Sequence, residues 1–323
     1  MGRDIIDRLL KSDEPSIRYK VRVNVLCEDG DSRAIRTLRN DIRKSARAAG
    51  LLAGRASDGT IAYHPYKKWC GAHWVLAALA DIGYPPGDKT LSPMADQVYG
   101  WLLSSHHETK STREIDGRVR RCASQEGNAV WSTLTLGLAD GRADELASRL
   151  IKWQWSDGGW NCDKRAEAAK SSFHETLLPL RALALYGRMK GSKEALAAAK
   201  RAAEIFLRRK MFKRLKDGQV MDPEFLLLCY PSYWHYDILS GLRVMAEAGF
   251  IRDRRCTEAL DYLESRRLGD GGFPADTKCY TMPTTRSSGA SPVAWGRVSK
   301  KKTNEFVTVD ALYALARAGR FAR

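Results

Sequence analysis

The sequence predicts an all-α protein in which helix hairpins repeat and close into a barrel of inner and outer helices. Two observations support this prediction. Five Asp-Gly pairs, which begin at Asp58, Asp116, Asp157, Asp217 and Asp270, are each followed by a variable loop and then by a helical pattern. The helical patterns alternate between an amphipathic kind and a more uniformly apolar kind. Because such a hairpin cannot bury its apolar face alone, the hairpins must stack on one another.

Residues 1–50 are predicted to form N-terminal capping helices, and residues 51–323 to form the hairpin repeats of the same single domain. The capping part contains two amphipathic stretches, EPSIRYKVRVNVL and DSRAIRTLRNDIRKSARAAG. No linker separates it from the repeats. The one long irregular stretch, residues 277–303, is rich in Pro, Ser, Gly and Thr, which is typical of lids and of disordered loops.

Each of these five Asp-Gly pairs is predicted to turn the chain from an outer helix into an inner one. In WQWSDGGWNCDK, residues 153–164, Asp157 can bond its own backbone and Gly158 accepts a positive φ. We expect Trp153 and Trp155 to pack this corner. The five corners begin at Asp58, Asp116, Asp157, Asp217 and Asp270, and the helices that follow are expected to close near Gly83, Gly141, Gly187, Gly249 and Gly319.

The helices before the corners carry one apolar stripe with Lys and Arg opposite, which predicts one face in water. Examples are RADELASRLIKWQW, residues 142–155, and SKEALAAAKRAAEIFLRRKMFKRLK, residues 192–216. The helices after the corners, such as SSFHETLLPLRALALYG, residues 171–187, are apolar on more than one face. We therefore expect a ring of buried (dry) inner helices, surrounded by a ring of outer helices that each have one solvent-exposed (wet) face.

Composition favours a soluble, cytoplasmic protein. The chain has 323 residues, 44% of them hydrophobic, and no apolar run approaches the ~20 residues of a membrane span. The first residues are charged where a signal peptide would be apolar. Seven scattered cysteines without a Cys-x-x-Cys pair fit a reducing compartment.

The net charge of +16 favours an anionic partner such as a diphosphate, an acidic polysaccharide, nucleic acid or a membrane surface. Basic runs are also common on solvated helix faces. The run RRKMFKRLK, residues 208–216, is predicted to lie on an outer helix that could contact a membrane peripherally. No helix-turn-helix pattern and no interleaved aromatic and basic platform is present, so we expect no specific nucleic-acid partner.

Polar and aromatic residues gather at the predicted N-terminal ends of the inner helices, where a closed ring would hold its cavity. Helix N-termini carry unpaired N–H groups and a partial positive charge, so several of them around one cavity would favour an anion. The same positions suit capping residues. Candidates for capping are Ser171, Ser172, Ser232 and Asn304.

The predicted catalytic residues form two sets, His174 with Glu175 and His235 with Asp237. Each set lies in the first turn of a predicted inner helix. A neutral imidazole beside a carboxylate can be oriented as a base, or the carboxyl can be held as an acid. Buried His–carboxylate pairs also occur as purely structural networks, and that alternative stays open.

The predicted substrate-binding residues are mainly aromatic and basic. Aromatic faces can shield an isoprenoid chain and stabilise a carbocation, and Arg and Lys can hold a diphosphate. The aromatic residues could equally belong to the core. The set is Tyr66, Lys67, Trp69, His73, Arg120, Arg121, Glu126, Asn128, Trp160, Cys162, Asp163, Tyr233, Trp234 and Tyr236.

The stretches QWSDGGWNCD and RRLGDGGFPAD, each followed by an apolar helix, resemble the repeats of the terpenoid-cyclase and protein-prenyltransferase superfamily. The chain resembles more closely the bacterial prenyltransferase or squalene-oxidase repeat-containing proteins. The likeness covers roughly residues 50–319. It implies an α/α toroid and an isoprenoid-handling enzyme, either a terpene cyclase or a prenyltransferase-like protein, with an isoprenoid or another small anionic molecule as substrate.

Two motifs of that superfamily are altered here. Proton-initiated cyclases place a DxDD acid at an inner-helix start, where this chain has SFHE, so the resemblance implies Glu175 as the acid. Protein prenyltransferases bind zinc through Asp, Cys and His. Cys162 and Asp163 with His174 or His235 could imitate this set at a different spacing. The sequence requires no cofactor and excludes neither zinc nor magnesium.

Two other classes of function stay open. Polysaccharide lyases resemble this chain in architecture and neutralise a uronate with Asn or Arg, while His and Tyr act as base and acid. The corresponding residues are Asn128, Arg121, His174, His235 and Tyr236. The third class is a non-catalytic binding scaffold. A cyclase or transferase predicts a deep apolar pocket, a lyase an open polar groove, and a scaffold a cavity filled by its own side chains.

Overall fold

The computed structural model describes residues 2–282 and 289–321, and the protein is all-α with a few short strands. The α-helices are α1 (Gly2–Leu10), α2 (Pro15–Lys20), α3 (Arg33–Lys44), α4 (Ala46–Leu52), α5 (Ala72–Asp81), α6 (Ser92–Leu102), α7 (Ser105–Ser111), α8 (Ala123–Thr135), α9 (Gly141–Trp153), α10 (Phe173–Lys190), α11 (Lys193–Leu207), α12 (Ile238–Ala248), α13 (Thr257–Ser265) and α14 (Glu305–Arg317). Shorter elements are η1 (Val21–Val25), η2 (Lys89–Leu91), η3 (Pro223–Leu226) and η4 (Arg254–Cys256).

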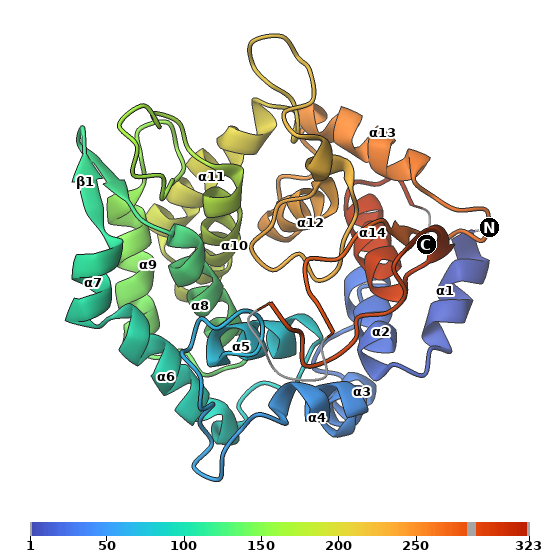
Figure 1. The fold of residues 1–323 in the computed structure, drawn as a ribbon. Coiled ribbons are helices and arrows are strands. Elements are labelled where there is room, and N and C mark those ends of the chain that lie inside the picture. Colours follow the sequence, from blue (N-terminus) through green and yellow to red (C-terminus); the bar gives the residue numbers. More distant parts are fainter. Residues whose placement is uncertain (1, 283–288, 322–323) are drawn as a thin grey trace.

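Contacts between helices follow a regular order. α5 packs on α8, α8 on α10, α10 on α12 and α12 on α14. α14 then contacts α2 and η1, and the order returns to α5 through α3 and α4. Figure 1 looks down on these helices, with α6, α9, α11 and α13 on their outer side.

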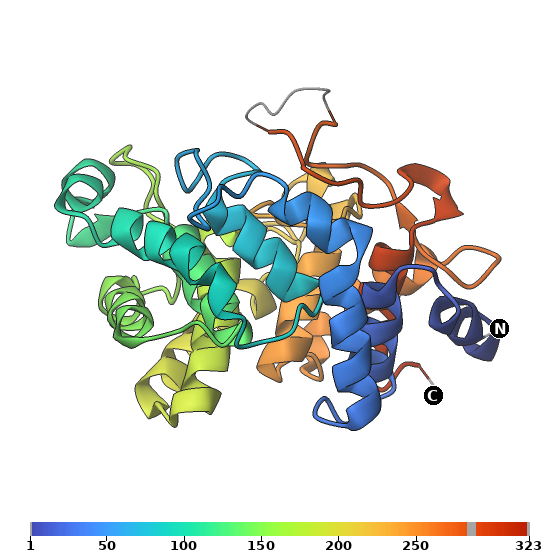
Figure 2. The same cartoon turned by 90° about the horizontal axis from the view of Figure 1, so that it is seen from below.

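The first and last parts of the chain are neighbours. The N-terminal helices lie beside the C-terminal part of the chain in two perpendicular views (Figures 1 and 2). The hydroxyl of Ser12 donates a hydrogen bond of 2.9 Å to a carboxylate oxygen of Glu305. The N-terminal helices therefore join the last helix to the rest of the fold.

The Asp-Gly corners have the backbone that the sequence predicts. The glycine of every corner has a positive φ: Gly59, Gly117, Gly158, Gly218 and Gly271. At the third corner, Asp157 accepts hydrogen bonds from the N–H and the hydroxyl of Ser171 at 2.9 and 2.6 Å. Trp153 and Trp155 are buried there, as expected.

The predicted contrast between dry and wet helices is confirmed. Almost every residue of α8 is buried, whereas α9 buries a single stripe that includes Ala143, Leu146 and Leu150. α10 is likewise buried on most sides, and α11 is buried mainly along its alanines. The inner helices therefore supply the core, and the outer helices separate it from water.

Two expected helix ends are wrong. Gly141 begins α9, because α8 already ends at Thr135. Gly187 lies inside α10. That helix ends at Lys190 and is followed by Gly191, whose φ is 70°. A Cβ at Gly187 would meet the side chain of Leu196 at 2.7 Å, so this glycine serves the close approach of α11 and not a turn.

The outer helix that was expected to run through residues 192–216 ends early. α11 stops at Leu207, and Lys210 and Met211 have φ values of 46° and 73°. Two consecutive residues in the left-handed region cannot continue a right-handed helix. Lys210 and Lys213 instead form ion pairs with Glu258 of α13, so the basic run is a folded loop.

The expected N-terminal helices are also divided. The first stretch forms α2 and η1, the second is split at Ser45 into α3 and α4, and α1 precedes both. Ser45 ends α3 and caps α4, because its hydroxyl accepts the N–H of Ala48. Two small antiparallel pairs of strands also occur: β1 (Arg113–Ile115) with β2 (Arg118–Arg120), and β3 (Pro274–Ala275) with β4 (Ser299–Thr303). Part of the irregular stretch 277–303 lies outside the described residues.

The packing of α8 on α10 depends on Gly127. A Cβ at this position would lie 2.6 Å from the backbone nitrogen of Pro179 and 2.7 Å from the carbonyl carbon of Leu178. We expect Gly127→Ala to destabilise the fold by about 1–3 kcal/mol, because neither backbone atom can move away cheaply. Urea unfolding followed by circular dichroism measures this change.

The matched control is Gly100→Ala on the exposed side of α6, where no heavy atom lies within 4 Å of the added Cβ. Removing a helical glycine without a clash should leave stability unchanged or raise it by up to ~1 kcal/mol. Equal stability of the two variants would contradict the close packing of α8 on α10.

Candidate functional site

The main cavity lies among the inner helices. Its walls come from α5, α8, α10, α12 and the loop that precedes α12. The aromatic residues that line it are Trp74, Trp131, Tyr230, Tyr233 and Trp295. The volume of the cavity is about 80 Å³. The cavity is therefore a narrow crevice between rings.

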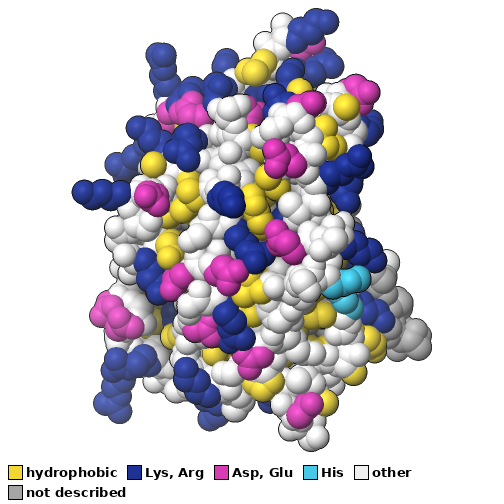
Figure 3. All heavy atoms as spheres, turned by 90° about the vertical axis from the view of Figure 1, so that its left-hand side faces the viewer, with side chains coloured by type: hydrophobic (Ala, Val, Ile, Leu, Met, Phe, Trp, Pro, Cys, Tyr) yellow, Lys and Arg dark blue, Asp and Glu magenta, His cyan; other side chains and the backbone are white. Residues whose placement is uncertain are grey.

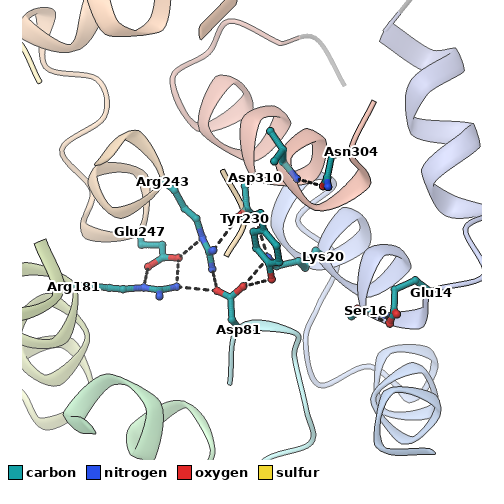
Figure 4. Close-up of polar contacts among 11 residues, drawn as sticks. Glu14, Ser16, Lys20, Asp81, Arg181, Tyr230, Arg243, Glu247, Asn304 and Asp310 are labelled. Carbon is teal, nitrogen blue, oxygen red and sulfur yellow. Dashed lines mark hydrogen bonds and ion pairs between the residues drawn. The ribbon is translucent and has the colours of Figure 1, made fainter. Parts of the chain in front are cut away.

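Six charged side chains form a closed network across the middle of the fold (Figure 4). Three are cations and three are anions, so the network is electrically balanced. Going round it, each cation lies between two carboxylates. In order, the members are Lys20 of α2, Asp81 of α5, Arg181 of α10, Glu247 and Arg243 of α12, and Asp310 of α14.

The network joins helices that are remote in sequence. Lys20 Nζ lies 2.9 Å from a carboxylate oxygen of Asp310 and 3.1 Å from one of Asp81. Arg243 donates to Asp310 at 2.9 Å and also bonds Asp81 across the ring. The hydroxyl of Tyr230 donates to Asp81 at 2.5 Å. Five helices therefore meet at one set of charges.

The second arginine of the network also contacts the remaining inner helix. Arg181 donates to both carboxylate oxygens of Glu247, at 2.5 and 2.7 Å. Its guanidinium carbon lies 3.5 Å from the ring centroid of Trp131 in α8. A guanidinium over an indole face is attracted by the ring quadrupole, more strongly when water is excluded.

The cations of the network hold two of its carboxylates, those of Asp81 and Glu247, in their ionised form. Burial alone would raise the pKa of Asp81, but the Arg243, Lys20 and Arg181 charges hold it well below its usual range. Burial is likewise outweighed at Glu247, whose pKa is lowered by Arg181 and Arg243. Asp81 and Glu247 are therefore bases without a proton to donate at neutral pH.

The network separates two spaces along the same axis. Asp81, Arg181 and Arg243 line the main cavity and also a second cavity. In α10 the main cavity is lined by Leu177 and the second by Leu185, which lie on either side of Arg181. These charged side chains thus lie between the two cavities. We call them the charged floor of the main cavity.

Sequence reasoning missed this network, although it left a signal. Arg181 and Arg243 are lone cations within apolar runs, LLPLRALAL and LSGLRVMA, and Asp310 interrupts FVTVDALYAL. A charge inside a helix that is apolar on all sides must find a partner in the core. What the sequence alone does not show is which helices supply that partner.

Of the predicted site residues, Asn128 and Tyr233 line the main cavity. The ring of Tyr233 stacks on Trp69 at 3.9 Å, and Trp69 contacts Trp74 edge-on at 4.8 Å. Asn128 Nδ2 lies 2.9 Å from Nε2 of His73. Burial lowers the pKa of His73 to about 3, so this imidazole is neutral at physiological pH.

His174 and Glu175 point to different neighbours. Nδ1 of His174 accepts the backbone N–H of Tyr236 at 3.0 Å, and burial lowers the pKa of this imidazole. Glu175 accepts the N–H of Ser124 at 3.0 Å and lies 3.4 Å from the thiol of Cys162. Burial raises the pKa of Glu175. The two adjacent side chains therefore do not form a pair with each other.

Asp237 caps α12. Its carboxylate accepts the N–H groups of Ser240 and Cys229 at 2.6 and 2.8 Å, and the hydroxyl of Ser240 completes the capping box. Burial raises the pKa of Asp237 to about 6. His235 stacks on Trp234 at 3.9 Å and bonds the carbonyl of Ser232 through Nδ1.

The basic candidates are engaged within the protein. Arg121 is buried and bonds Glu126 at 2.6 Å, and it also contacts Glu108 and Thr112. The equally buried Arg120 lies over the ring of Trp155 at 4.5 Å and donates to the carbonyl of Ala168. Burial raises the pKa of Glu126, which Arg121 opposes.

Four further candidates also have partners inside the protein. Asp163 forms an ion pair of 2.5 Å with Arg165, and Lys67 lies over the ring of Tyr63 at 3.9 Å. The indole of Trp160 donates to the carbonyl of Leu150, and the hydroxyl of Tyr236 to that of Met211.

The remaining aromatic candidates pack around rings and cations. Tyr66 packs among His73, Trp74 and Trp101. The ring of Trp234 lies beneath Lys68. Neither residue lines the main cavity.

Asn304 is the expected cap that the structure confirms. Its side-chain oxygen accepts the N–H of Val307 at the start of α14. Ser172 precedes α10 without a side-chain cap bond, and Ser171 bonds Asp157 instead. Ser232 contributes its carbonyl to His235, several residues before α12 begins.

The face of the molecule in Figure 3 carries Lys and Arg side chains spread among Asp and Glu. Because the central network is balanced, the excess positive charge of the chain lies outside it. In the described part of the chain, no helix combines the length and the apolar character of a membrane span. Comparison with protein-family models and with curated proteins found no match for this chain.

The network predicts a large effect of neutralising one carboxylate. Asp81→Asn should destabilise the protein by about 3–5 kcal/mol, because it leaves three largely buried cations with two anions. The control is Asp96→Asn, which breaks a pair with Arg142 in which the aspartate side chain is 58% exposed. Such surface pairs contribute about 0–1 kcal/mol. Urea unfolding of both variants measures the difference, and similar losses would contradict a buried network.

Proposed function

We propose that this chain is an α/α toroid protein that binds a slender apolar molecule, of the isoprenoid kind, in the main cavity. Two observations support the toroid: the order of helix contacts returns to its starting helix, and wet helices flank dry ones. The resemblance of the Asp-Gly repeats to the terpenoid-cyclase and protein-prenyltransferase superfamily agrees with it. The single observation on which the proposal of an apolar ligand rests is the aromatic lining of a narrow interior cavity.

The lining favours a flexible hydrocarbon chain. Ligand sites are mostly apolar and aromatic, with a few polar groups that orient the ligand. Three leucines line the cavity beside the aromatic rings, namely Leu177, Leu178 and Leu239. Neutral polar groups come from Asn128 and Ser240. A chain of small cross-section fits between flat rings, whereas a bulky polycyclic molecule requires the rings to move.

The charged floor favours a neutral ligand over a diphosphate. Each cation of the floor contacts at least two carboxylates, so an added anion would have to displace an existing partner. Asp81 stays ionised beside its three cations and does not serve as a proton donor for an alkene. We therefore propose binding of an isoprenoid alcohol or hydrocarbon, and we do not derive a cyclisation from these residues.

A non-catalytic scaffold is the second candidate. The observation that favours it is the small volume of the main cavity, about 80 Å³.

The residues that would suit a polysaccharide lyase are already bonded to other groups of the protein. Arg121 bonds Glu126, Asn128 faces His73, and the hydroxyl of Tyr236 bonds a backbone carbonyl.

The test measures binding of farnesol and geraniol to the full chain through quenching of tryptophan fluorescence. Farnesol should bind at least ten times more tightly than geraniol, because each buried carbon contributes up to ~0.8 kcal/mol.

Ala78→Leu extends a side chain into the cavity and should weaken farnesol binding by roughly tenfold or more, because overpacking costs ~1–3 kcal/mol.

Ala197→Leu is the matched control, because it makes the same change on the exposed face of the outer helix α11. It should leave farnesol affinity unchanged. Weakening in both variants, or no saturable binding of either alcohol by the wild-type chain, would overturn the ligand proposal and leave the scaffold.

A further inference from the structure

Three side chains that can bind metals meet outside the main cavity. They are the thiols of Cys122 and Cys162 and the carboxylate of Glu175, whose donor atoms all lie within 4.8 Å of one another. Cys122 directly precedes α8, Cys162 lies in the loop between α9 and α10, and Glu175 lies in the first turn of α10. Within residues 2–282 and 289–321, no other three His, Cys, Asp or Glu side chains come this close.

Backbone hydrogen bonds hold the three segments in place. The N–H of Arg121 donates to the carbonyl of Asn161 at 3.3 Å, which joins the residue before Cys122 to the residue before Cys162. One carboxylate oxygen of Glu175 accepts the N–H of Ser124 at 3.0 Å. The other oxygen faces the thiol of Cys162 at 3.4 Å. The anchored oxygen is the kind of outer hydrogen bond that orients a metal ligand.

The donor set and its spacing fit a thiophilic ion. In a tetrahedral zinc site with Zn–S near 2.3 Å and Zn–O near 2.1 Å, neighbouring donors lie ~3.6–3.8 Å apart. The observed separations, 3.4 Å for one pair and at most 4.8 Å for the others, need an adjustment of about 1 Å or less. Two thiolates with one carboxylate exclude the hard ions, because calcium and magnesium prefer oxygen ligands.

We propose that Cys122, Cys162 and Glu175 bind one Zn²⁺ ion, with a water molecule in the fourth position. This set shares only Cys162 with the set that the superfamily resemblance suggests. Asp163 is paired with Arg165, and His174 Nδ1 already accepts a backbone N–H. The ion would tie the start of α8 to the start of α10, and so stabilise the folded chain in proportion to its affinity.

The first experiment uses Co²⁺ as a spectroscopic probe. The full chain is stripped with a chelator under a thiol-free reductant and titrated with Co²⁺. We expect a sulfur-to-cobalt charge-transfer band and tetrahedral d–d bands that saturate at one equivalent, and their loss when Zn²⁺ is added. Absence of a charge-transfer band in the wild-type chain overturns the proposal, whatever the variants do.

Variants then assign the ligands. Cys122→Ser and Cys162→Ser should each weaken Zn²⁺ binding by more than the ~10–100-fold that outer-shell changes cost. Glu175→Gln keeps the size of the side chain and should weaken binding while the cobalt–thiolate band remains. The melting temperature of the wild type should rise with added Zn²⁺, and those of the ligand variants should rise less.

The matched control removes the other close pair of thiols. Cys229 Sγ and Cys279 Sγ lie 3.6 Å apart, as close as the proposed ligands, without belonging to the three-donor group. Cys229→Ser with Cys279→Ser should therefore keep one equivalent of Zn²⁺ and the same cobalt spectrum. Loss of the cobalt spectrum in this control, with retention in Cys122→Ser, would place the metal elsewhere and overturn the assignment.

Discussion

The six-charge network is the interaction on which the arrangement of inner helices depends. Apolar packing alone is not directional and would allow several registers between helices of Leu and Ala. Lys20 and Asp310 are 290 residues apart in sequence, and a bond of 2.9 Å between them fixes where the N-terminal helices meet α14. A buried cation without this partner would be strongly unfavourable, so the alternative registers are penalised.

The same network determines what the interior can bind. It divides the axis of the fold into two spaces and uses its cations to neutralise its own carboxylates. The walls above it are aromatic and the floor is balanced in charge. The net charge of +16 had suggested an anionic substrate, but that charge is a sum over the whole chain, and the network at its centre is balanced. This is why we propose a neutral chain-like ligand for the cavity.

Local chemistry made much of the fold predictable. Asp157 and Gly158 specify a turn by their own conformational preferences, and the stripe of α9 specifies a wet outer helix. What depends on remote neighbours was not predictable. The residues after Leu207 continue a helical pattern, yet Glu258 on another helix holds Lys210 in a loop. Gly187 reads as a helix end, but its role is to admit Leu196.

The candidate site was less predictable than the fold for the same reason. The N-terminal ends of the inner helices are rich in His, Trp and Arg. Most of these side chains contact other residues of the same helix starts or of the neighbouring loops. Glu175 was identified from its position, but its neighbour Cys122 was not, because their proximity arises from the packing of α8 on α10. Asn128 and Tyr233 were found because they belong to both the helix starts and the cavity wall.

A double-mutant cycle on Lys20→Met and Asp310→Asn tests the role of the network most directly. Each variant alone leaves the network with one excess charge, because Asp310 keeps Arg243 and Lys20 keeps Asp81 as a partner, whereas the double variant restores the balance between cations and anions. We predict a favourable coupling of about 0.5–3 kcal/mol, measured as unfolding free energies in urea. Losses that add to within ~0.3–0.5 kcal/mol would contradict the account, because they would mean that the two charges do not depend on each other.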